Sequence, residues 1–197
     1  MDDLLVLSPN GRWTAFLEEM LDRSIHLGIR DISFSSVTLA LGQEHFLQNS
    51  GAILSGLRRS RYEHCLLVID EDRSDDGLLE SLTTQLDTIW GGNASVIIAQ
   101  PSVESWMLEG HRAFSRIPQL RGIDVRRWFA ETGVWPMGTD TPDQPRHALE
   151  ALFSAFRIEP SNAHYRLIAR HFPIRLDQFS SSSLRKLVTQ LNDWFPG

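Results

Sequence analysis

Short apolar runs alternate with segments of helical periodicity in the first half of the chain. Three runs are continuous, which is typical of strands buried on both faces: LLVL at 4–7, CLLVI at 65–69 and SVIIA at 95–99. A further strand is predicted from Ile32 to Leu39. The segments between the strands carry apolar residues at helical spacing, as from Trp13 to Leu21. This alternation predicts an α/β fold with about four mainly parallel strands flanked by helices.

The pattern changes from about residue 105 onward, where helical periodicity continues without further strands. A loop rich in Pro, Gly and Thr, VWPMGTDTPDQP at 134–145, interrupts it. The run SSSS at 180–183 precedes the last apolar repeat and predicts a serine-capped final helix. We therefore expect an α/β core over 1–115 and a helical C-terminal region over 116–197 that packs on the core.

Composition and charge restrict the function classes. The net charge of −6 argues against binding nucleic acid by overall electrostatic attraction. No apolar run approaches the roughly 20 residues that a membrane-spanning helix needs. The N-terminus, MDDLLVLSPNG, has two acids where a secretory signal carries basic residues, so we expect a cytoplasmic protein with no membrane association.

Carboxylates cluster directly after the third predicted strand, in LLVIDEDRSDD at 66–76. In an extended conformation Asp70 and Asp72 point to the same side, with Glu71 on the opposite side. Two carboxylates placed in this way offer oxygen ligands to one Mg²⁺ ion. The alternative is that they are solvated loop acids, and the spacing alone leaves both interpretations open.

Glu104 is the second candidate, in QPSVESWMLEGHRAF at 100–114. It falls in the first turn of a helix after the fourth strand. Because the carboxyl ends of parallel strands meet at one edge of a sheet, we expect it within reach of Asp70. The alternative is an acid that complements the helix dipole. A capping box does not account for it, because Ser102 is one residue too close.

These two segments, LLVIDEDRSDD after strand three and IIAQPSVESWML after strand four, resemble those of TOPRIM-like bacterial proteins. The chain is most similar to small ATPase-associated TOPRIM proteins of defence and mobile loci, which are distantly like the overcoming-lysogenization-defect nucleases. The resemblance covers most of the chain, including the closing FSSSSLRKLVTQL. It implies a four-stranded parallel sheet between helices and a Mg²⁺ (or Mn²⁺) site for phosphodiester chemistry. By this resemblance Asp70 and Asp72 are the paired acids, and Glu104 is the acid of a Glu-x-Trp signature; all three are the predicted catalytic and metal-binding residues.

One motif departs from this pattern. Where TOPRIM proteins carry Val-Glu-Gly after strand one, this chain has VLSPNG at 6–11, without an acid. Glu18 and Glu19 lie about two turns into the following helix, too far to substitute, and one of them is expected to face solvent. Arg12, next to the turn, is the candidate for binding a phosphate near the acids.

Two main hypotheses follow. The first is a Mg²⁺-dependent nuclease acting on nucleic-acid phosphodiesters, with a role in phage defence. The second is a catalytically degenerate binding or regulatory subunit of a complex with an ATPase encoded nearby. The missing acid after strand one favours the second, and retention of Asp70, Asp72 and Glu104 favours the first. A weaker third alternative is a domain that binds or hydrolyses nucleotides at the same sheet edge.

Overall fold

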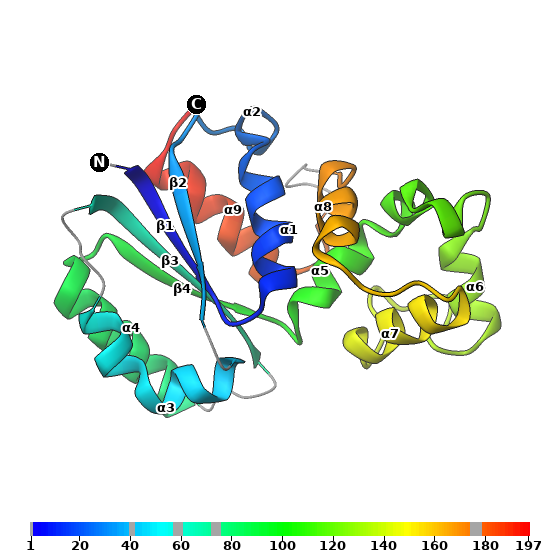
Figure 1. The fold of residues 1–197 in the computed structure, drawn as a ribbon, viewed down its shortest axis with the longest axis horizontal. Helices are drawn as coiled ribbons and strands as arrows, with labels where there is room; N and C mark the ends of the chain where they lie inside the picture. Colours follow the sequence, from blue (N-terminus) through cyan, green and yellow to red (C-terminus); the bar gives the residue numbers. More distant parts are fainter. Residues whose placement is uncertain (1, 40–41, 57–60, 72–75, 174–178) are drawn as a thin grey trace.

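The centre of the molecule is a four-stranded parallel sheet (Figure 1). The computed structural model describes residues 2–39, 42–56, 61–71, 76–173 and 179–197. The strands are β1 (Asp2–Ser8), β2 (Phe34–Thr38), β3 (Tyr62–Asp70) and β4 (Ala94–Ala99), in the order β2-β1-β3-β4. The predicted α/β class with a parallel sheet of four strands is confirmed.

Helices cover both faces of the sheet (Figure 1). On one face lie α1 (Gly11–Leu21) and α9 (Ser182–Trp194), and on the other lie α3 (Gly42–Ser55) and α4 (Asp76–Trp90). Successive strand residues point to opposite faces, so Leu66 belongs to the first apolar cluster and Leu67 to the second. Both faces of the sheet are therefore buried, which explains why the strand sequences are continuous apolar runs.

The remaining helices extend the molecule to one side of the sheet (Figure 1). Apart from the short α2 (Ser24–Leu27), which follows α1 next to the C-terminus, they are α5 (Val103–Glu109), two 3₁₀ turns (His111–Arg116 and Pro118–Leu120), α6 (Val125–Glu131), α7 (Pro145–Ala155) and α8 (Asn162–Arg170). The apolar cluster that begins under α1 continues without a break into these helices. Among the described helices, none is long and apolar enough to cross a membrane.

The last helix returns from the helical C-terminal region to the sheet, where its apolar side joins the cluster under α1. Its start matches the serine prediction, because the Ser181 hydroxyl accepts a 3.2 Å hydrogen bond from the Leu184 amide. Residues of the region 116–197 thus complete one of the two faces of the α/β core.

The two glutamates of α1 differ from their predicted placement. Glu19 is only 8% exposed. It accepts two hydrogen bonds from Arg170, of 2.7 and 3.1 Å. Glu18 pairs with Arg166. The prediction that one of them faces solvent is wrong, because α8 packs against this side of α1 and its arginines hold both carboxylates.

Candidate functional site

Asp70 is the last residue of β3 and lies at the carboxyl edge of the sheet, in register with Ala99 at the end of β4. Its side chain is only 3% exposed. Its Oδ1 accepts a 3.0 Å hydrogen bond from the amide of Val103, the first residue of α5. The carboxylate is therefore fixed between the end of one strand and the start of the helix that follows the next.

Glu104, the second residue of α5, faces the same edge. It is 5% exposed, and its Oε1 accepts a 3.1 Å hydrogen bond from Trp13 Nε1. Its Oε2 is buried and has no hydrogen-bond partner among the residues that the structure describes. Trp106 and Leu108 of the same helix are fully buried and anchor it in the core. Because a buried charged oxygen without a donor is costly, this atom marks a site suited to a cation or an additional donor.

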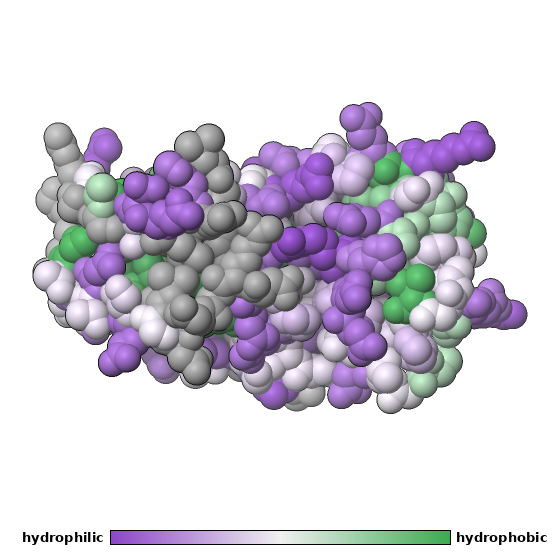
Figure 2. All heavy atoms as spheres, turned by 90° about the horizontal axis from the view of Figure 1, so that it is seen from below, coloured by the Kyte–Doolittle hydropathy of each residue, from purple (hydrophilic) through white to green (hydrophobic). Residues whose placement is uncertain are grey.

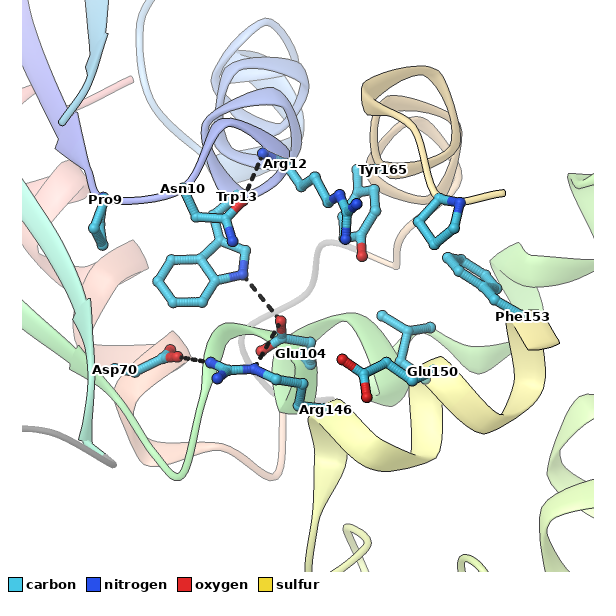
Figure 3. A pocket seen from close by; sticks show the side chains of 12 residues that line it. Pro9, Asn10, Arg12, Trp13, Asp70, Glu104, Arg146, Glu150, Phe153 and Tyr165 are labelled. Carbon is cyan, nitrogen blue, oxygen red and sulfur yellow. Dashed lines mark hydrogen bonds and ion pairs between the residues drawn. The ribbon is translucent and has the colours of Figure 1, made fainter. Parts of the chain in front are cut away.

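Arg146, in the first turn of α7, lies between the two carboxylates (Figure 3). Its Nη2 donates to Asp70 Oδ2, and its Nε lies 3.6 Å from Glu104 Oε1. Its guanidinium carbon is also 5.9 Å from the centre of the Trp13 ring. One guanidinium thus serves two buried acids that come from neighbouring strand ends.

A cavity of about 290 Å³ opens beside this group. Arg12, Trp13 and Tyr165 line it from α1 and α8, opposite Arg146 and Glu150 of α7 (Figure 3). The Arg12 guanidinium lies 5.9 Å from the centre of the Tyr165 ring. Figure 2 views this side of the molecule, where hydrophilic side chains gather between the α3–α4 side and the helical C-terminal region.

The pKa of the Tyr165 phenol depends on the charges in this cavity. Burial raises its pKa to about 12, and the negative charge of Glu104 acts in the same direction. Arg12 opposes both, through its positive charge and a side-chain hydrogen bond. The hydroxyl is therefore neutral at physiological pH. Its pKa responds to the charges of both Glu104 and Arg12.

Three predicted site residues, Asp70, Glu104 and Arg12, come together around this cavity. The fourth, Asp72, lies outside the described residues. At the end of β1, Asn10 lines the cavity, and its Oδ1 accepts a 2.9 Å hydrogen bond from the Arg12 amide as the cap of α1. One residue of the segment 8–10, where the resemblance implies an acid, therefore serves as a helix cap.

The sequence patterns did not point to Arg146, Glu150 or Tyr165 as site residues. Arg146 carries one signal that could have identified it. A cation in the first turn of a helix opposes the helix dipole, so an arginine at that position indicates a specific anionic partner. The identity of that partner, a strand end far away in the sequence, has no local signature.

The oxygens of Asp70 and Glu104 have the chemistry that Mg²⁺ and Mn²⁺ prefer. Within the described part of the chain, Glu104 Oε2 has no donor, so these residues fit a divalent cation. Across the described ranges, however, no group of three or more His, Cys, Asp or Glu is arranged to hold a metal ion. No protein-family model, curated protein or solved structure is significantly similar to this chain.

Proposed function

We propose that this chain is a TOPRIM-like nuclease that hydrolyses phosphodiester bonds of nucleic acid with the help of Mg²⁺ or Mn²⁺. The observation that carries the proposal is the convergence of Asp70 and Glu104, two buried carboxylates from adjacent strand ends, on one cavity walled by arginines. Ordinary structural acids do not need to be buried together, because each buried charge costs desolvation free energy.

The roles of the residues follow from their placement. Asp70 and Glu104 would hold the ion, with the amide of Val103 orienting the Asp70 carboxylate and the indole of Trp13 orienting that of Glu104. When bound, the ion supplies Lewis acidity to the phosphate and a water nucleophile at neutral pH. Arg12 would bind a phosphate oxygen from the opposite wall of the cavity, since a guanidinium pairs well with phosphate.

Cleavage assays test this proposal. Wild-type protein is incubated with single- and double-stranded DNA and RNA in Mg²⁺ or Mn²⁺, beside Asp70→Asn and Glu104→Gln. Asp193→Asn and Glu131→Gln serve as matched controls, because both residues are exposed and lie outside the cavity lining. We expect metal-dependent cleavage by the wild type and the controls and none by the site variants. Cleavage that persists in Asp70→Asn would overturn the proposal.

A second candidate is the catalytically degenerate binding or regulatory subunit, docking on an ATPase encoded nearby in a defence locus. Two observations favour it: the segment 8–10, where the resemblance implies an acid, instead ends in Asn10 as the cap of α1, and Arg146 already supplies a cation to Asp70 and Glu104. Under this proposal the wild type cleaves no nucleic acid in any metal. Instead it co-purifies with the neighbouring ATPase, and Asp70→Asn retains that association.

A further inference from the structure

Arg146 occupies the position that a bound cation would take. Its guanidinium contacts Asp70 Oδ2 and approaches Glu104 Oε1, and these two side chains are 3% and 7% exposed. Buried acids of this kind need a positive charge wherever they are kept ionised. The chain thus supplies its own cation to the pair, and a metal ion has to compete with it for the same oxygens.

The orphaned oxygen of Glu104 favours a metal ion in this competition. Glu104 Oε2 is buried and has no hydrogen-bond donor among the described residues. A divalent ion would give that oxygen a partner, which the Arg146 guanidinium does not. The attraction between charges in a partly buried site is several-fold stronger than in water, so this added contact is substantial.

The Arg146 side chain also has space into which it can move. Its side chain is 41% exposed, whereas the two carboxylates are almost fully covered. Arg146 lies in the first turn of α7, where the helix dipole is positive. The dipole therefore does not stabilise the positive charge of its guanidinium at that position. The cavity of about 290 Å³ lies directly beside it, with Arg12 on the opposite wall (Figure 3).

We propose that Arg146 is an exchangeable counter-ion: it neutralises Asp70 and Glu104 without metal, and a divalent cation displaces it toward the cavity. There, together with Arg12, it binds the substrate phosphate. The planar guanidinium suits both tasks, because it pairs with carboxylate and with phosphate. This inference rests on the proposed function, in that it takes Asp70 and Glu104 as the metal-holding pair.

The experiment measures Mn²⁺ affinity by titration calorimetry for the wild type and Arg146→Gln. If the displaced arrangement is about one-tenth populated in the wild type, the apparent dissociation constant is weakened about tenfold, and Arg146→Gln removes that penalty. We therefore expect about tenfold tighter Mn²⁺ binding by Arg146→Gln. Arg127→Gln is the matched control, because Arg127 also pairs with a carboxylate, that of Glu131, but both of these side chains are exposed. Its Mn²⁺ affinity should equal that of the wild type.

A second readout tests the phosphate role. With Mn²⁺ at saturation, inorganic phosphate should bind Arg146→Gln more weakly than the wild type, although the metal binds more tightly. Opposite effects on the two ligands are what an exchangeable counter-ion requires. A purely structural role of Arg146 would weaken both.

The outcomes separate the inference from the function on which it rests. Mn²⁺ binding by Arg146→Gln that is equal to or weaker than that of the wild type overturns the exchange, and loss of binding in Asp70→Asn then leaves the metal site standing. Absence of Mn²⁺ binding in both wild type and Arg146→Gln overturns both proposals. If Arg146→Gln does not fold, Arg146→Lys replaces it. A lysine cannot bridge two acids with a planar fork, so its Mn²⁺ affinity should exceed that of the wild type, and an unchanged affinity overturns the exchange.

Discussion

The indole Nε1 of Trp13 donates a 3.1 Å hydrogen bond to Oε1 of Glu104, 91 residues further along the chain. Both residues are almost completely buried, at 3% and 5% exposed. The bond joins the first turn of α1 to the first turn of α5 and fixes the carboxylate beside the guanidinium of Arg146 (Figure 3). A tryptophan that periodicity assigns to the core therefore also holds a charged side chain in place.

This bond should be measurable in the free energy of unfolding. Trp13→Phe removes the donor to a charged acceptor, whereas Trp106→Phe removes a 2.9 Å bond to the neutral hydroxyl of Ser183. Hydrogen bonds to charged groups contribute about 1.5–3 kcal/mol and neutral ones about 0.5–1.5 kcal/mol. The volume change is the same at both sites, so Trp13→Phe should cost about 1 kcal/mol more in urea unfolding. An equal or larger cost for Trp106→Phe would contradict this assignment.

Divalent metal should stabilise the folded protein through Asp70 and Glu104. A ligand at about 100 times its dissociation constant adds about 2.7 kcal/mol if it binds only the folded state. For a chain of this size that corresponds to roughly 5–10 °C in the unfolding midpoint. We expect Mn²⁺ or Mg²⁺ to raise the midpoint of the wild type and of Asp193→Asn, but not that of Asp70→Asn. A shift of equal size in Asp70→Asn would place the metal elsewhere.

Tyr165 offers an optical probe of the charge on Glu104. The chain has two tyrosines, so Tyr62→Phe leaves Tyr165 as the only phenol. Its pKa, raised to about 12 by burial and by Glu104, should fall in Glu104→Gln and rise in Arg12→Gln. Absorbance at alkaline pH measures both changes. A pKa unaffected by Glu104→Gln would mean that the two groups do not interact.

The same pKa predicts how stability depends on pH. A phenol whose pKa is higher in the folded than in the unfolded chain favours folding while it remains protonated. Its contribution is complete below about pH 10, the ordinary range of tyrosine, and is lost as the pH rises toward 12. In the Tyr62→Phe background, Tyr165→Phe should therefore flatten the alkaline decline of unfolding free energy. An identical decline in both proteins would exclude Tyr165 as its source.

The sheet, and the meeting of Asp70 with Glu104 in the site, could be predicted from the sequence. Apolar runs at 4–7, 65–69 and 95–99 identify strands, because a strand buried on both faces of a sheet is apolar throughout. The carboxyl ends of parallel strands meet at one edge of the sheet, and this places Asp70 and Glu104 together. Arg146 could not be placed in this way. It reaches the acids only because α7 packs beside α5, and such helix packing depends on the whole apolar surface, not on a local pattern.

The glutamates of α1 show the same limit. Helical spacing places Glu18 and Glu19 well into α1, away from the strand end. It does not reveal which side chains face them. Their partners, Arg166 and Arg170, lie on α8, which follows almost the entire core in sequence. Pairings between distant helices set the burial of these acids, so a solvent-facing position was the wrong expectation.

Asn10 provides a direct test of whether an acid shortly after strand one would strengthen the site. Asn10→Asp keeps the helix cap, because Asp and Asn cap equally well, and adds a carboxylate to the cavity beside Asp70 and Glu104. An acid is also favourable at the N-terminus of α1, so the variant should be as stable as the wild type. Asn10→Ala, the comparison variant, should lose about 1 kcal/mol of unfolding free energy with the cap.

The added carboxylate of Asn10→Asp should strengthen metal binding because it places an acid shortly after the end of strand one. An extra negative charge within several ångströms of the ion, at intermediate dielectric, should tighten the Mn²⁺ dissociation constant by at least about threefold. Calorimetric titration of Asn10→Asp, Asn10→Ala and wild type measures this. If Asn10→Asp also gains cleavage that the wild type lacks, the missing acid is what separates this chain from an active nuclease. Unchanged Mn²⁺ affinity would show instead that Asn10 does not face the metal-binding oxygens, and that strand one contributes only a helix cap.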